Sequence, residues 1–296
     1  MAMMATKHCV SIVYSLSHIP TTPLHQTPLF DVHTSTHLYT HTHVYIHMHP
    51  FNSLGRARAI RSQGPLVSKD LSEQAAADYQ TSLKLSSRED WDTDMEMIED
   101  GAARNPYAAW EWGASLRAAG KYKEAATAHA LASQAFKDIG DRARSVIALL
   151  DSGIDLAASG NVEETKSVLT KAIKATTAVE GRDVALLQRV VAKEGEGRMA
   201  LASVLWANNE RAAAETQLSD ACVRLEQLEA DAQVRNAAAN KDDMQVADGL
   251  KFSIDDQASV FDITCSRFRN EKFLEETVQW PMPLREKMTK LNNLGR

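Results

Sequence analysis

Hydrophobic and small side chains recur at the spacing of α-helices through most of the chain after residue 106, and part of this pattern is repeated. Gly113 and Gly120 are followed forty residues later by Gly153 and Gly160. No proline occurs at residues 107–279, which favours long helices because a proline inside a helix costs about 3 kcal/mol. We therefore predict an all-α repeat array, with an irregular helical bundle as the alternative.

Each repeat is predicted to form a helix, a short turn and a second helix. In the first repeat, Trp112, Gly113 and Leu116 lie on the first helix, and the turn follows at residues 120–122. Gly113 on the first helix and Ala125 on the second are small enough to let the two backbones approach closely. The second repeat carries this pattern forty residues later, so we expect its two helices to pack in a similar way.

A third, degenerate repeat follows the second at an interval of 49 residues. Leu205, Asn209, Ala214 and Ala221 take the places of the leucine, the turn glycine and two small positions of the second helix. The longer interval predicts either an insertion or an extended first helix within residues 181–197.

The part of the chain from residue 68 onward divides into three segments. The helical repeat domain is predicted to span residues 68–236, and the polar stretch 237–249 is predicted to be a loop. Residues 250–296 are rich in aromatic side chains, among them Phe268 and Trp280. Because the end of a repeat array exposes the face that a further repeat would bury, we expect this segment to form a cap.

Residues 1–67 differ in composition from the rest and are predicted to be disordered. Nine of the ten histidines lie before Pro50, but His-x-His alternation in a flexible tail lacks the ligand geometry of a metal site, so no metal is predicted. The codons for residues 39–49 can alternate strictly between purines and pyrimidines, so part of the segment is interpreted as a gene-model artefact. Its basic, acid-poor bias also fits an organelle transit region.

Charge and composition exclude several classes of function. The 296 residues carry a formal net charge of −6, which disfavours nucleic-acid binding. No apolar run approaches the ~18 residues of a membrane-spanning helix, so no membrane span is predicted. His129 is the only histidine after residue 49, no phosphate-binding glycine loop occurs, and the acidic residues 89–100 lack the calcium-loop pattern. We therefore predict no catalytic residues and no cofactor, with an enzyme site near Glu194 and Glu196 as an alternative.

Cys222 and Cys265 are the only cysteines after Cys9. Buried thiols are the simplest interpretation, and a disulfide that joins the third repeat to the C-terminal residues is the alternative hypothesis. Electrophoretic mobility that reduction leaves unchanged would count against this disulfide.

The first repeat resembles the tetratricopeptide repeat (TPR) family. TPR units carry a bulky residue before a glycine, as at Trp112 and Gly113, and glycine-x-aromatic at the turn, as at Gly120 and Tyr122. The forty-residue period exceeds the usual ~34 residues. The resemblance implies a superhelical solenoid of antiparallel helix pairs, whose concave groove binds a protein or an extended peptide. Transferred to this chain, the groove positions of the family are Tyr107, Trp110, Arg117, Leu150, Ile154, Glu196, Met199 and Trp206.

Further short strings resemble a plant group of TPR-like proteins of the chloroplast thylakoid lumen. These strings are Ala-Trp-Glu-Trp-Gly at 109–113, Lys-Glu-Gly-Glu at 193–196, Leu205-Trp206 and Trp280-Pro281. The resemblance implies a non-catalytic scaffold or adaptor that helps to assemble or maintain a chloroplast complex. A cytosolic TPR adaptor of the kind with longer repeats is the alternative.

Overall fold

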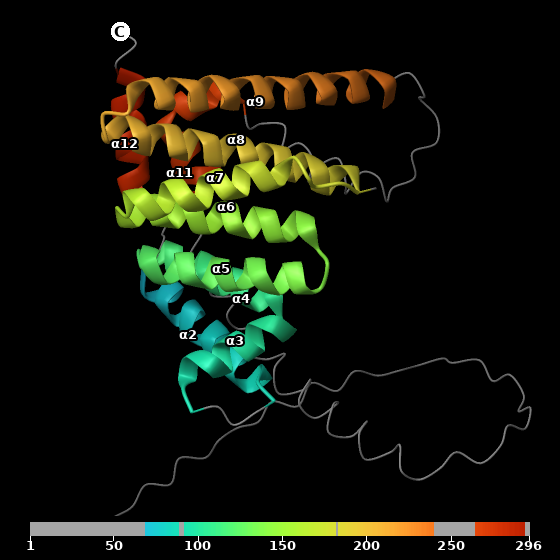
Figure 1. Cartoon of the computed structure of the whole chain (residues 1–296), viewed down its shortest axis with the longest axis vertical. Helices are drawn as coiled ribbons and strands as arrows, with labels where there is room; N and C mark the ends of the chain where they lie inside the picture. Colours follow the sequence, from blue (N-terminus) through green and yellow to red (C-terminus); the bar gives the residue numbers. More distant parts are fainter. Residues whose placement is uncertain (1–68, 89–91, 182, 240–263, 294–296) are drawn as a thin grey trace, which may run out of the picture. The chain divides into compact units, whose positions relative to one another are not determined.

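The computed structural model describes residues 69–88, 92–181, 183–239 and 264–293 (Figure 1). Within these ranges the chain forms ten α-helices and one 3₁₀-helix, and no β-strand. The prediction of an all-helical fold is therefore confirmed for this part of the chain. The predicted disordered segment 1–67, residues 240–249 of the predicted loop and residues 250–263 of the predicted cap lie outside the described ranges.

Six of the helices form three consecutive pairs, each joined by a short turn. The pairs are α4 (Pro106–Ala118) with α5 (Tyr122–Asp138), α6 (Arg142–Ser159) with α7 (Val162–Thr176), and α8 (Val184–Ala207) with α9 (Arg211–Ala239). The helices of each pair pack against each other, and α5 also packs against α6. We refer to α4, α6 and α8 as the first helices. Since α9 continues to Ala239, helical structure extends past residue 236, where the sequence predicts the loop to begin.

Within the described ranges, two helices precede the first pair. α2 (Lys69–Ser86) packs against both α3 (Asp94–Arg104) and α4. A capping box begins α3: the Thr93 hydroxyl accepts a hydrogen bond from the backbone N–H of Glu96 at 3.3 Å, and the backbone N–H of Thr93 donates to the Glu96 carboxylate at 3.0 Å. The side chain of Asn105 then caps α4, so the chain passes from one helix to the next without an intervening loop.

The turn inside each helix pair contains one residue with a left-handed backbone. These residues are Gly120 (φ 80°), Gly160 (φ 86°) and Asn209 (φ 64°). Glycine has no Cβ to oppose this conformation, and asparagine is one of the few other residues that adopt it readily. The three residues keep the intervals of 40 and 49 residues found in the sequence, so each turn lies where the repeat predicts it.

Glycines also let the two helices within each of the first two pairs approach each other closely. A Cβ atom on Gly113 would lie 2.6 Å from the imidazole of His129, and one on Gly153 would lie 2.4 Å from Leu169. Both members of the second contact stand forty residues after those of the first, so α4 crosses α5 at the position where α6 crosses α7. In the third pair most of the longer interval is taken up by an extended first helix, since α8 has 24 residues and α6 has 18, and the connection before α8 is also longer than the one before α6.

Residues 264–293, termed the C-terminal segment, form η2 (Cys265–Arg269), α11 (Glu271–Glu276) and α12 (Met282–Asn292). We predicted that this region would cover the last helix of the array. In the structure η2 contacts α9, but α12 packs against α8 and α6. Trp280, Leu284 and Met288 are at most 3% exposed and join one core with apolar side chains of α6 and α8. The segment therefore lies on the first helices of two pairs.

Candidate functional site

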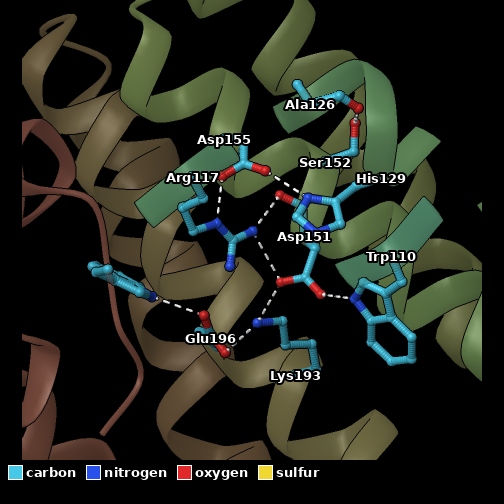
Figure 2. Close-up of polar contacts among 10 residues, drawn as sticks. Trp110, Arg117, Ala126, His129, Asp151, Ser152, Asp155, Lys193 and Glu196 are labelled. Atoms are coloured by element: carbon cyan, nitrogen blue, oxygen red, sulfur yellow. Dashed lines mark hydrogen bonds and ion pairs between the residues drawn. The ribbon is translucent and has the colours of Figure 1, made fainter. Parts of the chain in front are cut away.

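Five charged side chains from the three first helices meet in the interior (Figure 2). Arg117 comes from α4, Asp151 and Asp155 come from α6, and Lys193 and Glu196 come from α8. We term these five residues the charge cluster. Asp151 and Asp155 are four residues apart, and Lys193 and Glu196 are three apart, so each pair projects from one side of its helix.

Two cations connect the carboxylates of the charge cluster. Arg117 donates through Nε to Asp155 Oδ1, and through Nη2 to Asp151 Oδ1 and the Asp151 backbone carbonyl, both at 3.1 Å. The planar guanidinium suits this fork of acceptors. Lys193 Nζ lies 2.8 Å from Asp151 Oδ1 and 2.9 Å from Glu196 Oε2. The ion pairs therefore join α4, α6 and α8.

Two indole rings contact the charge cluster from different elements. Trp110 Nε1, on α4, donates to Asp151 Oδ2 at 3.0 Å. Trp280 Nε1, in the C-terminal segment, donates to Glu196 Oε1 at 2.9 Å. Each indole satisfies one carboxylate oxygen that the cations leave available, which lowers the cost of burying these charges.

His129 of α5 is also bound to the charge cluster. Its Nδ1 lies 2.7 Å from Asp155 Oδ2, and the side chain is 1% exposed. Its Nε2 packs against Gly113 and has no hydrogen-bond partner in the described part of the chain. A histidine that acts as a general base must come within about 3.2 Å of a substrate atom. Here the backbone of α4 occupies the space in front of Nε2.

Burial and ion pairing act in opposite directions on the charge cluster. Burial alone would raise the pKa of Asp151, but Lys193 and Arg117 outweigh it and hold that pKa far below its usual value. Burial would lower the pKa of Lys193, but Asp151 and Glu196 raise it above its usual value. Burial would also lower the pKa of Arg117, and Asp155 outweighs this and raises it. These three groups therefore remain charged at neutral pH.

Glu194 is a second buried carboxylate of α8, and it binds other helices. It is 1% exposed and accepts hydrogen bonds from Thr176 of α7 at 2.9 Å, Arg198 at 3.0 Å and Arg224 of α9 at 3.1 Å. Residues two apart on a helix point to different sides. Glu194 and Glu196 thus contact different partners, and the structure does not bring them together as a pair of carboxylates.

Four of the predicted groove residues reach the surface at least in part: Tyr107, Trp110, Trp206 and Arg117, whose side chain is 13% exposed. Tyr107 is 51% exposed, whereas Trp110 and Trp206 are partly buried. The rings of Tyr107 and Trp110 lie on Phe136, with centroids at 5.0 and 5.6 Å, and the Arg144 guanidinium lies 5.6 Å from the centroid of Tyr107. We term Tyr107, Trp110 and Arg144 the aromatic edge.

The other predicted groove residues lie inside the protein. Glu196 of the charge cluster is 3% exposed, and Leu150, Ile154 and Met199 are 0% exposed. The structure corrects the expectation that these four side chains line an open groove. The expectation assumed that the first helices face solvent over their whole length, whereas the C-terminal segment covers part of α6 and α8.

Cys222 of α9 and Cys265 of η2 form a disulfide, with Cα atoms 4.8 Å apart. This is the pairing that the sequence raised as a hypothesis, and the simpler interpretation as two separate thiols does not describe the structure. The bond joins the third helix pair to the C-terminal segment. Both cysteines are partly exposed.

Sequence reasoning assigned no shared role to Asp151, Asp155 and His129. One signal could have indicated it: two aspartates stand one helical turn apart within the mainly apolar stretch 146–158. Charged residues are rarely buried unless they are paired. Such a pair on the apolar side of a helix indicates a buried partner, although the sequence does not say which cation supplies it.

Two further kinds of site were sought in the described ranges. No three His, Cys, Asp or Glu side chains there are grouped in a way that could hold a metal ion. None of the helices described combines the length and the apolar character that crossing a membrane requires. Comparison of the chain with protein-family models, with curated proteins and with solved structures gave no match.

Proposed function

We propose that this chain is a non-catalytic, TPR-like scaffold that docks a protein partner on the aromatic edge. The observation that carries the proposal is an exposed surface of aromatic and arginine side chains on helices that buried ion pairs hold together. Tyr107, Trp110 and Arg144 are of the residue types that dominate binding energy at protein interfaces. The repeated turns and helix crossings support the TPR-like solenoid, which presents such side chains along one face.

Exposed apolar side chains extend the surface around the aromatic edge. Ile139, at the end of α5, is 60% exposed, and Val184, at the start of α8, is 45% exposed. Trp110 and Leu186 of α8 pack against the same apolar cluster, so the start of α8 lies near the edge. The surface therefore spans the starts of the three first helices. A strip of this extent fits a polypeptide segment better than a small molecule.

The chemistry of the charge cluster supports a structural role. A general acid or base must change its protonation near the working pH. The pKa of Asp151 lies far below that range, and the pKa of Lys193 is raised away from it. Ion pairs whose partners are all present fix the relative positions of α4, α6 and α8 instead.

The resemblance to thylakoid-lumen proteins supports a chloroplast location, where the scaffold would help to assemble or maintain a complex. The disulfide supports an oxidising compartment over the cytosol of the alternative adaptor, because cytosolic thiols are kept reduced. Fusion of the authentic N-terminal coding sequence to a fluorescent reporter distinguishes the chloroplast location from the cytosolic one. Import into plastids supports the first location, and diffuse cytosolic fluorescence supports the second.

Photo-crosslinking tests the docking surface. A photoreactive phenylalanine analogue replaces Tyr107 in the full-length protein, and the same analogue at Leu85 of α2, which is 47% exposed, is the matched control. In a chloroplast extract we expect a crosslinked polypeptide at position 107 only. Unlabelled wild-type protein should compete for it, and the Tyr107→Ala/Arg144→Ala variant should not. Equal crosslinking at both positions, or competition by the double variant, would contradict the proposal.

A further inference from the structure

The disulfide holds the C-terminal segment by one end. It links Cys265, at the start of η2, to Cys222 across 43 residues of sequence. Both cysteines are partly exposed at the boundary between η2 and α9, so a thiol in solution can approach the bond. Access to one sulfur is the geometric requirement for thiol–disulfide exchange.

Noncovalent contacts hold the rest of the C-terminal segment. Trp280 donates to Glu196, and Lys287 Nζ donates to the backbone carbonyl of Ala157 near the end of α6. Leu284 is fully buried in the core shared with α6 and α8. The helices themselves are short: α11 has 6 residues and α12 has 11, whereas isolated helices below roughly 12–15 residues are marginal in water. Their helical structure therefore depends on docking.

The docked state also contains polar groups that gain little from docking. The hydrogen bond of Lys287 to Ala157 is offset in part, because burial and the neighbouring Lys290 lower the pKa of its ammonium group. Arg285 Nε is buried without a hydrogen-bond partner among the described residues, although its terminal nitrogens pair with Glu271 and Glu275. Buried polar atoms without partners reduce the stability of the state that buries them. These groups weaken the noncovalent attachment of α12, which the covalent tether does not depend on.

We propose that the Cys222–Cys265 disulfide is a redox latch, which holds the C-terminal segment on α6 and α8 and lets it undock when a dithiol reductant opens the bond. A thiolate of the reductant attacks one sulfur and releases the other cysteine as a thiolate, which takes up a proton. The second thiol of the reductant then resolves the mixed disulfide. Two electrons and two protons pass to the protein, which gains two thiols, and the reductant leaves as a disulfide.

Undocking uncovers the parts of α6 and α8 against which α12 packs, and the core there also includes Ile154 and Met199, which stand at groove positions of the TPR family. That these side chains would then receive a partner rests on the proposed function, but the release of the segment does not. Closing a 43-residue loop restricts the undocked state most, so the chain-entropy relation puts the rise in undocking after reduction at up to about 10³-fold.

Hydrogen exchange of the full-length protein, followed by mass spectrometry, tests the latch. We expect amides of α11 and α12 to exchange up to about 10³-fold faster in dithiothreitol than in the oxidised protein, with α4 and α5 unchanged. Cys265→Ser should exchange at the fast rate without reductant and should not respond to it. Cys9→Ser is the matched control and should respond as the wild type does. Far-UV circular dichroism checks that each variant remains helical.

Three results would overturn the latch. The amides of α11 and α12 could keep their rate after reduction, which would show that the noncovalent contacts suffice. All helices could accelerate together, which would make the disulfide a general staple of the fold. Titration of the unreduced protein could find all three cysteines free. None of these results bears on crosslinking at Tyr107, so failure of the latch and failure of the docking proposal can be told apart.

Discussion

The first helices α4, α6 and α8 carry the predicted groove positions in two parts, and these two parts have opposite environments. Near the start of α4, Tyr107 is half exposed and Trp110 is partly buried. Further along α6 and α8, Ile154 and Met199 are fully buried in a core that includes the C-terminal segment. The charge cluster binds the indole of Trp110 in the first part and the indole of Trp280 in the C-terminal segment, which covers the second part. A repeat thus sets the side of the helix on which a residue lies, and a segment outside the repeat decides whether that side meets solvent.

Asp151→Ala should lower the stability of the protein more than the other substitutions, because the charge cluster joins α4, α6 and α8. We expect the free energy of unfolding to fall by about 3–5 kcal/mol, since Arg117 and Lys193 would keep buried charges with a partner missing. Urea denaturation followed by circular dichroism measures this. Glu163→Ala is the matched control, because its carboxylate pairs with Lys166 while 82% exposed, and it should change stability by less than about 1 kcal/mol. Equal effects of the two variants would refute a joining role for the cluster.

Low pH should weaken the ion pairs of the charge cluster that join α4, α6 and α8. The pKa of Asp151 is lower in the folded protein than its unfolded value of about 3.9, so its stabilising contribution is complete well above pH 4 and is lost as the pH falls below that value. Urea midpoints measured between about pH 7 and pH 3 should therefore drop more steeply for the wild type than for Asp151→Asn. Parallel pH profiles would show that other carboxylates dominate the acid response.

Ile154→Ala and Tyr107→Ala compare the covered and the open part directly. Truncating the buried isoleucine removes apolar contacts and leaves a cavity, so we expect a loss of about 3 kcal/mol. Truncating the half-exposed tyrosine should cost less than about 1 kcal/mol, because half of its surface already meets water. Urea midpoints of the two variants provide the test. Similar losses would mean that the two parts do not differ as the structure indicates.

Trp280→Phe should lower stability least among the substitutions of buried residues. The substitution keeps most of the apolar contact but removes the N–H that binds Glu196 Oε1, so we expect a loss of about 1–3 kcal/mol. Trp206→Phe is the matched control: its ring is partly exposed beside Arg211, and its loss should stay below about 1 kcal/mol. A larger loss in the control would indicate that the Trp280 contact contributes little to docking of the C-terminal segment.

The helix pairs and their turns could be predicted because local rules determine them. Gly120 and Gly160 occupy turns that need a left-handed backbone, and Asn209 marks the third turn even though glycine is absent there. The absence of proline and the spacing of small residues then define the helices between the turns. The extra length of the third repeat was also visible, although the sequence left open whether it is a loop or a longer helix.

The environment of the candidate site could not be predicted in the same way. The spacing of Leu284, Met288 and Leu291 indicates an apolar helix side but does not specify the helix on which that side docks. The partners of Asp151 come from α4 and α8, at sequence separations that no local pattern connects. Burial of the predicted groove residues is therefore a long-range property, and the family positions alone gave the wrong environment for Ile154 and Met199.

Trp110 gives the molecule a built-in optical reporter. Its ring is partly exposed at the aromatic edge, while its N–H is bound to a carboxylate of the charge cluster. A ligand that covers the ring would change both its hydration and the field from Asp151, and indole emission responds to both. Contact at the surface could thus be followed by intrinsic fluorescence without any added label.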